Sequence, residues 1–275
     1  VDMHTGDELE ELSDVFNEMG PKLLERQKMK ESLALAMEIQ QHLLPQESPK
    51  LEGFDIAGTS LFSDETGGDY YDFIDLVDLG TGKLGIAVGD ITGHGIGAAL
   101  LMASARAVLR SHAIHHSGDL GALFEDINQH LVRDTGESRF LTLFYGVLDA
   151  ENRSLRWISG GHDAPLRLHA ESGKIEDLPS SAGLLLGVIE GATYTESEPI
   201  TLDRGDIILI GTDGVWEARN PAKEMFGKQR LREVIRRCAG DSARSIYEAV
   251  IAAVKDFSET TRQEDDITLV VIKAL

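Results

Sequence analysis

The stretch "GDITGHGIGAALLM", residues 89–102, joins an apolar run to a cluster of glycines and a second apolar segment. An apolar run ends at Asp90, two glycines follow within five residues, and a strongly apolar segment begins at Ile96. The run before Asp90 predicts a buried strand, and the segment after Gly95 predicts a helix over residues 96–116. Asp90 is therefore expected at the end of a buried strand, where a carboxylate is costly unless it is paired or binds a metal ion.

The same placement recurs at other acids. Asp69 and Asp72 open the strand-like run "GGDYYDF", Asp213 closes "DIILIGTD", and Asp265 and Asp266 open "DDITLVVI". One Asp-Gly pair is more often a turn than a ligand, but four placements at strand ends favour a shared site. Carboxylates without a histidine or cysteine cluster form the hard oxygen site that Mg²⁺ or Mn²⁺ prefers.

The net charge of the chain limits the classes of partner that it can bind. There are 47 acidic and 26 basic residues, which gives a formal net charge of −21. Such a surface repels phosphate backbones and anionic lipid, so nucleic acid and direct membrane-surface binding are disfavoured. Cys238 is the only cysteine, so no disulfide forms within the chain, as expected for a reducing cytoplasm.

The order of the expected elements indicates the fold class. From residue 50 onward, short runs of β-branched and aromatic residues lie between Gly, Asp and Asn breaks. Helices are expected in pairs, over residues 96–116 and 120–132 and over residues 228–238 and 242–257, with Asp119 as an N-cap. Paired helices between runs of strands predict an α+β sandwich of antiparallel sheets rather than a doubly wound parallel sheet.

The N-terminal segment carries a heptad pattern. Apolar residues recur at alternating three- and four-residue spacing at Leu9, Leu12, Phe16, Met19 and Leu23, and again at Leu33, Met37 and Leu44. Proline disrupts helices, so Gly20-Pro21 is expected to kink or break this one. The helix could pack on its own domain or join two copies of the chain as a parallel coiled coil. Its mostly polar circumference favours the coiled coil and a homodimer.

Five ordered motifs, "GGDYYDF", "GDITGHGIGAALLMA", "SGGHDAPL", "TDGVWEARN" and "EDDITLVV", closely resemble those of the bacterial metal-dependent, type 2C-like serine/threonine protein phosphatases of the RsbU/SpoIIE kind. The resemblance covers residues 43–275. The preceding "DELEELSDVFNEM" resembles the second helix of a HAMP signalling domain. These resemblances divide the chain into a HAMP-like remnant (1–20), a linker helix (21–45) and a phosphatase domain (46–275). They imply a cytoplasmic domain whose full-length protein is anchored in a membrane through a missing N-terminal part.

The phosphatase resemblance implies an αββα fold, a two-sheet antiparallel β-sandwich flanked by helix pairs, with two Mn²⁺ or Mg²⁺ ions. By the same resemblance, Asp90 would bridge both ions and the backbone carbonyl of Ile91 would bind one of them. Asp213 and Asp265 would hold the other ion, and Asp69 would coordinate directly or through water. Asp266 is a further candidate ligand, at a place where the related motif often has Asn. Asp72 is expected to be a supporting residue.

The implied reaction is hydrolysis of phosphoserine or phosphothreonine by a metal-activated water, with an anti-sigma-factor antagonist of the STAS type as the substrate. His94 is a candidate general acid, although a histidine between glycines can equally cap a helix or brace a loop. His162 in "GGHDAP" has the same two interpretations, and a structural role in the turn is favoured.

The sequence departs from the related pattern at two places. No arginine before Asp69 corresponds to the one that binds phosphate in eukaryotic relatives, and Gly97 stands where proline usually continues the helix. Glycine is less suited than proline to a first helical turn, so a looser helix start is expected.

Two other functions are compatible with parts of the sequence. "GGDYYDF" is superficially similar to the "GGDEF" loop of nucleotidyl cyclases, but the other acids here lie downstream of the motif, which disfavours a cyclase. The second alternative is a catalytically silent module that binds the same protein partner. Loss of a metal-binding acid would favour that alternative, and no such loss is visible.

Overall fold

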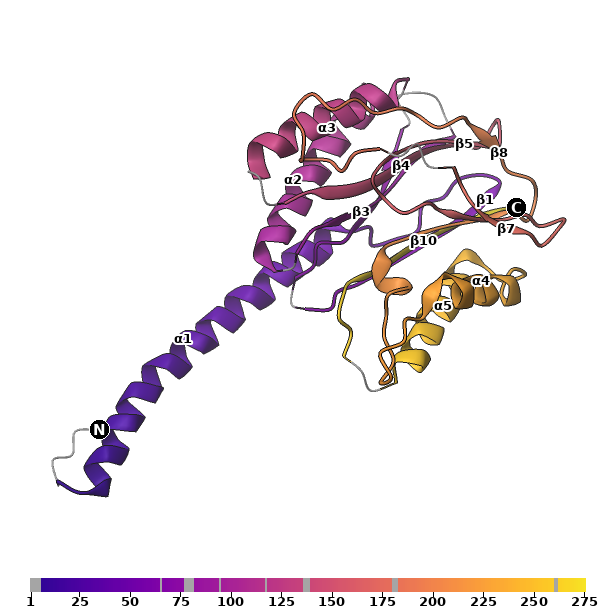
Figure 1. The fold of residues 1–275 in the computed structure, drawn as a ribbon. Helices are drawn as coiled ribbons and strands as arrows, with labels where there is room; N and C mark the ends of the chain where they lie inside the picture. Colours follow the sequence, from indigo (N-terminus) through magenta and orange to yellow (C-terminus); the bar gives the residue numbers. More distant parts are fainter. Residues whose placement is uncertain are drawn as a thin grey trace.

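In the computed structural model, two antiparallel sheets pack face to face and a pair of helices covers each outer face (Figure 1). The structure describes residues 6–64, 66–76, 82–93, 95–116, 118–135, 139–179, 183–259 and 262–275. This architecture confirms the α+β sandwich that the spacing of strands and helix pairs predicts. No helix in these ranges is long and apolar enough to cross a membrane.

One sheet has the strand order β1-β10-β9-β6-β7. Its strands are β1 (Phe54–Leu61), β6 (Leu166–Leu168), β7 (Ile175–Asp177), β9 (Ile207–Gly211) and β10 (Ile267–Ala274). The outer face of this sheet is covered by α4 (Gly227–Arg237) and α5 (Ala243–Ser258), the lower pair in Figure 1. Ser242 caps α5 by accepting a hydrogen bond from the backbone N–H of Ser245.

The other sheet has the order β2-β3-β4-β5-β8. Its strands are β2 (Tyr70–Asp75), β3 (Lys83–Ile91), β4 (Leu141–Asp149), β5 (Ser154–Gly160) and β8 (Ile200–Thr201). Above it lie α2 (Ile96–Ala113) and α3 (Leu120–Thr135) (Figure 1). The expected N-cap of α3 is present, because Asp119 Oδ1 accepts a hydrogen bond from the Ala122 N–H at 3.0 Å.

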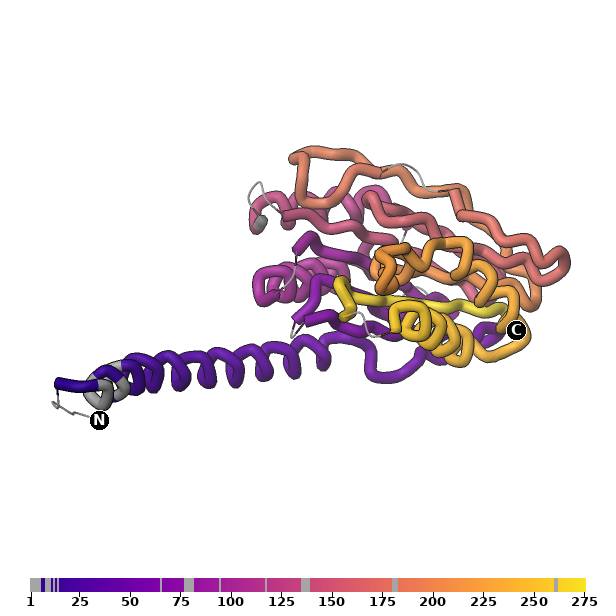
Figure 2. The backbone as a smooth tube through the Cα atoms, turned by 60° about the horizontal axis from the view of Figure 1, so that its bottom comes forward, coloured from indigo at the N-terminus to yellow at the C-terminus, as the bar shows by residue number. Residues whose placement is uncertain are grey.

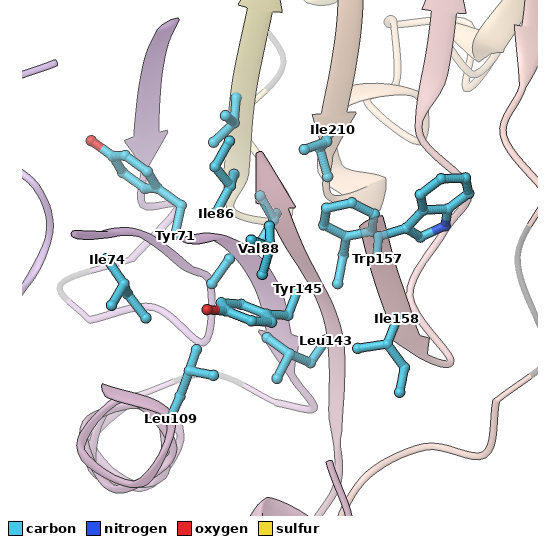
Figure 3. Close-up of a cluster of buried hydrophobic side chains, with 14 of the residues drawn as sticks. Tyr71, Ile74, Ile86, Val88, Leu109, Leu143, Tyr145, Trp157, Ile158 and Ile210 are labelled. Carbon is cyan, nitrogen blue, oxygen red and sulfur yellow. The ribbon is translucent and has the colours of Figure 1, made fainter. Parts of the chain in front are cut away.

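Successive side chains along a strand point to opposite faces of its sheet, and apolar residues on both faces of β9 and β10 explain why helices cover the outer face. Ile208, Ile210, Val270 and Ile272 point between the sheets, and Figure 3 shows Ile210 beside Trp157 and Val88 in this core. Their sequence neighbours on β9 and β10, such as Leu209 and Val271, pack with α4 and α5 instead. Strands that are apolar on both faces are buried on both faces, which is the pattern of a layered sandwich.

The N-terminal segment forms one continuous helix, α1 (Glu8–Leu43), which projects away from the sandwich (Figures 1 and 2). The predicted break at Gly20-Pro21 is wrong, because Pro21 lies inside the helix. Residues 21–32 are all exposed to solvent, so water can replace the one backbone hydrogen bond that proline removes.

The heptad pattern divides between two environments. Leu33, Met37 and Leu44 are half-buried or buried against the chain's own domain, whereas Phe16, Met19 and Leu23 are 64%, 52% and 58% exposed. The structure does not describe the side chains of Leu9 and Leu12. The C-terminal part of α1 therefore follows the first interpretation of the pattern. The N-terminal part presents an apolar face without a partner among the described residues of this chain.

Candidate metal centre

Strand β3 places Asp90 where the backbone of another loop lies against it. Asp90 pairs with Thr142 of β4, and its side chain is half-buried. A Cβ atom on Gly68 would lie 3.3 Å from Asp90 Oδ1 and 3.2 Å from the carbonyl oxygen of Gly93, and closer still to the carbonyl oxygen of Ile91. Only glycine permits this approach, which brings the loop of residues 66–69 onto the end of β3.

Asp69 joins the two sheets. It is only 2% exposed, and its Oδ2 accepts a hydrogen bond from Thr212 Oγ1 at 2.7 Å. Thr212 directly precedes Asp213, and its Oγ1 also accepts the Thr268 N–H of β10 at 3.0 Å. The hydroxyl of Thr212 thus connects the start of β2 with the ends of β9 and β10.

The electrostatics show that the predicted acids share one site. The pKa of Asp90 is raised from 3.8 to about 7, first by burial and then by repulsion from Asp213, Asp265 and Asp266. Burial, Asp90 and Asp266 also raise the pKa of Asp69 well above its usual value. A group of carboxylates that raise one another's pKa lacks positive charge to compensate it.

The adjacent acids Asp265 and Asp266 have different environments. Asp265 is exposed, and it lines a surface hollow of about 540 Å³ together with Asp90, Ile91 and Gly93. Asp266 is 5% exposed, and its carboxylate accepts hydrogen bonds from Ser63 N at 2.7 Å, Ser63 Oγ at 3.1 Å and Gly68 N at 2.9 Å. Asp266 thus holds the loop of residues 66–69 in place, and Asp265 faces the hollow.

This donor set fits hard divalent cations. The available donors are carboxylate oxygens and the carbonyl of Ile91, and oxygen donors of these kinds are the ones that Mg²⁺ and Mn²⁺ prefer. In the part of the chain that the structure describes, no three acidic, histidine or cysteine side chains yet converge at metal-binding geometry. Mutual repulsion opposes such convergence without a cation. Cations would remove this repulsion, so the residues present suit them.

The remaining predicted residues lie outside the acid cluster or outside the described residues. Asp72 is buried beside Arg106 and Arg110, at 3.5 and 3.4 Å, and accepts a hydrogen bond from the Tyr70 hydroxyl at 2.9 Å. It therefore attaches α2 to β2, which is a supporting role. His94 lies outside the described residues.

His162 is buried in the turn after β5. Its backbone N–H donates to Ser159 Oγ at 3.1 Å, and its Nδ1 lies 3.0 Å from Thr142 Oγ1. Burial lowers the pKa of His162 to about 4, so the ring is neutral at physiological pH. These contacts fit the structural role in the turn.

Sequence reasoning missed Gln40, which connects α1 to this site. Its side chain is 2% exposed, its Nε2 donates to the carbonyl of Gly67 at 2.7 Å, and its Oε1 accepts the Gly67 N–H at 3.2 Å. Both hydrogen bonds act on the residue that lies two positions before Asp69. One sequence feature could have identified Gln40: it is a polar residue at a position where the heptad pattern of Leu33 and Met37 predicts an apolar one.

Comparison with known proteins agrees with this geometry. The family model described as "Stage II sporulation protein E (SpoIIE)" matches residues 80–275, well over half of the chain. The chain belongs to the SpoIIE family. This membership confirms the resemblance drawn from the five motifs and is inconsistent with the nucleotidyl cyclase alternative. The HAMP-like part of the prediction has no support from the comparisons and stays a prediction.

Similar proteins come from several bacteria. The chain is 28% identical to phosphoserine phosphatase RsbU of Bacillus subtilis, over 90% of this chain and 71% of that protein. It is 29% identical to protein IcfG of Synechocystis sp., over 86% of this chain, and spans 40% of that protein's length. The solved SiaA-PP2C domain of Pseudomonas aeruginosa superimposes with a TM-score of 0.75 at 25% identity, over 90% of this SpoIIE-family chain and 98% of that domain.

Proposed function

We propose that this SpoIIE-family domain hydrolyses phosphoserine or phosphothreonine in a protein substrate. The observation that carries the proposal is a group of four acids at the ends of strands in both sheets. Asp90 raises the pKa of Asp69, and Asp213 and Asp265 raise the pKa of Asp90. The similarity to a phosphoserine phosphatase and to a PP2C domain supports the same reaction.

In this proposal, Asp90 would be a ligand of both of two divalent cations, Mn²⁺ or Mg²⁺. The Ile91 carbonyl would complete one coordination sphere, and Asp213 and Asp265 would hold the other ion. Such ions supply a nucleophilic water at neutral pH and neutralise the charge of a phosphate ester. Asp69 and Asp266 fix the geometry, because they tie the loop of residues 66–69 to β9 and β10.

The test compares the wild type with Asp90→Asn and with a matched control, Asp75→Asn, at an exposed position at the end of β2. Phosphate release from p-nitrophenyl phosphate and from a phosphoserine protein is measured with Mn²⁺ and with chelator. We expect release that requires metal and that Asp90→Asn reduces by at least about a hundredfold, while Asp75→Asn leaves it unchanged. Titration calorimetry of Mn²⁺ should show weakened binding for Asp90→Asn only. Metal-independent release, or full activity of Asp90→Asn, would reject the mechanism. A folded wild type that binds the phosphoprotein without releasing phosphate would instead be the catalytically silent binding module.

We further propose a phosphorylated STAS-type anti-sigma-factor antagonist as the substrate. The similarity to RsbU supports this choice, and the net charge of −21 makes nucleic acid an unsuitable alternative. Release of phosphate from such an antagonist domain, at a higher kcat/KM than from its phosphorylated peptide alone, would support recognition of the folded partner. Equal values for the two would argue against it.

We also propose that two copies pair through the N-terminal part of α1. Phe16, Met19 and Leu23 form an exposed apolar row at heptad spacing on a helix that extends beyond the domain. Sedimentation of the whole chain should give a dimer mass, and the triple substitution of these residues by Glu should give the monomer. Equal masses for the two proteins would reject the pairing.

A further inference from the structure

The backbone beside Arg139 is bonded to the loop that follows Asp90. Arg139 directly precedes Phe140, whose N–H donates to Thr92 Oγ1 at 3.1 Å and whose carbonyl accepts the Thr92 N–H at 3.1 Å. Thr92 follows Asp90 and Ile91 on the loop that leaves β3. The backbone next to Arg139 is therefore fixed to the segment that carries the central acid.

The guanidinium of Arg139 rests on Gly97, in the first turn of α2. A Cβ atom at Gly97 would lie 2.5 Å from Nη2 and 2.6 Å from Cζ of Arg139. Any side chain at residue 97 would thus displace the guanidinium. Because glycine has only a hydrogen in place of a side chain, residue 97 leaves the space that the guanidinium of Arg139 occupies.

The charge of Arg139 is not neutralised by the described part of the chain. Three other cations near the site are paired: Lys228 with Asp163 at 2.7 Å, Arg219 with Glu264 at 3.6 Å, and Arg262 with Asp64. No carboxylate among the described residues pairs with Arg139, and Arg139 is not among the groups that shift the pKa of Asp90 or Asp69. A cation beside the positive N-terminal end of α2 is also unfavourable without an anion.

We propose that Arg139 binds an anionic oxygen of the phosphoprotein substrate and that Gly97 holds its guanidinium in place to do so. The inference rests on the proposed phosphatase function, and it assigns a residue that recognises the substrate. Arginine binds phosphate and carboxylate oxygens in a bidentate manner, so both the phosphate and an acidic residue beside it share the required chemistry. Ile96 and Leu100, which are 47% and 67% exposed on the same helix, offer an apolar surface for the protein around that anion.

The experiment measures kcat, KM and binding for Arg139→Gln, Arg139→Lys and Gly97→Ala, with Arg236→Gln on α4 as the matched control. The substrates are p-nitrophenyl phosphate and two phosphoserine peptides, one with acidic and one with neutral flanking residues. We expect Arg139→Gln to raise KM about tenfold or more, the loss typical of a hydrogen bond to a charged group, with kcat within about twofold. Arg139→Lys should recover part of this loss, and the Mn²⁺ requirement should not change.

The substrates distinguish the two sources of the anion. A loss shared by all three substrates assigns Arg139 to the phosphate, and a loss confined to the acidic peptide assigns it to a flanking carboxylate. Gly97→Ala should reproduce the loss, and Gly97→Ala combined with Arg139→Gln should be no worse than Arg139→Gln alone, because both remove one contact.

Unchanged KM for Arg139→Gln on every substrate, from an active enzyme, would overturn the inference. Additive effects of the two substitutions would overturn the role of Gly97. Fluorescence anisotropy with the same peptides separates this inference from the proposed function. A wild type that binds them through Arg139 but releases no phosphate contradicts the function and retains the inference.

Discussion

Asp265 and Asp266 are neighbours in sequence with different structural roles. The Asp265 side chain is exposed at the hollow, whereas the Asp266 carboxylate is buried under hydrogen bonds from Ser63 and Gly68. A buried carboxylate with several donors stabilises the loop it binds, and an exposed one is available to a cation.

Alanine substitution should separate these roles. Without metal, Asp266→Ala should lower the free energy of unfolding by about 2 kcal/mol, because it leaves buried N–H donors unsatisfied. Asp265→Ala should lower it by less, about 1 kcal/mol or under, because this exposed side chain accepts the Asp266 N–H at 2.8 Å. Urea denaturation in chelator measures both, and calorimetry should show that Asp265→Ala weakens Mn²⁺ binding. Equal stability of the two variants would contradict the distinction.

The acids of the site could be predicted from the sequence because strand ends and glycines mark them locally. Gln40 could not be predicted in the same way. Its partner, Gly67, lies 27 residues away, and only the packing of α1 on the domain brings the two together. Arg139 was missed for the same reason, since its contact with Gly97 depends on how β4 and α2 meet.

At the scale of the element, helix α1 ends in a specific attachment. The final turns of α1 carry the buried Gln40, whose amide pairs with both backbone groups of Gly67. Its neighbour Gln41 is exposed. The end of a helix of 36 residues, about 54 Å long, is therefore bonded directly to the loop before Asp69.

Gln40→Leu should weaken metal binding, and Gln41→Leu is the matched control. Leucine has nearly the same size but leaves the N–H and carbonyl of Gly67 without these partners, which costs roughly 1–3 kcal/mol. The loss of these hydrogen bonds should loosen the loop before Asp69, and the Mn²⁺ concentration for half-saturation should then rise about tenfold. Calorimetry at fixed pH measures it. Equal Mn²⁺ affinities for the two variants would show that the attachment stabilises α1 alone.

Helix α1 also shows where local signals mislead. Gly20-Pro21 is a strong helix breaker in isolation, yet the helix continues through it. The heptad pattern extends on both sides of Pro21. Because the helix is exposed to solvent there, the loss of one backbone hydrogen bond does not outweigh the many others that stabilise the helix on either side. The paired helices of the domain were predicted within three residues at each end, since apolar periodicity and packing agree there.

At the scale of the whole molecule, the acid cluster makes stability depend on pH. The pKa of Asp90 is about 7 in the folded chain against 3.8 for the free side chain, and that of Asp69 is shifted in the same direction. Between these values the folded state binds more protons than the unfolded state. The contribution of these two acids to the free energy of unfolding therefore falls as the pH rises through this window, and it outweighs the smaller opposite contribution of His162, whose pKa is lowered by burial.

The metal-free protein should consequently resist urea better at pH 5.5 than at pH 8. Asp90→Asn should flatten this dependence, because its amide does not titrate. Mn²⁺ should restore stability at pH 8, and its affinity should rise with pH because protons compete for the same oxygens. Urea midpoints across the pH range, with and without metal, provide the measurement. A wild-type midpoint that rises with pH in chelator would contradict the prediction.

Asp90 lies in a strand of one sheet and Asp69 directly precedes another strand of it, whereas Asp213 and Asp265 adjoin strands of the other sheet. Under the metal assignment proposed above, the ions would connect the two sheets of the sandwich. A ligand that binds only the folded state stabilises it by mass action, so a cell starved of divalent metal would hold a chain that opens more often. Proteases degrade opened chains. Metal supply would then determine how many molecules survive in the cell, in addition to how fast each one works.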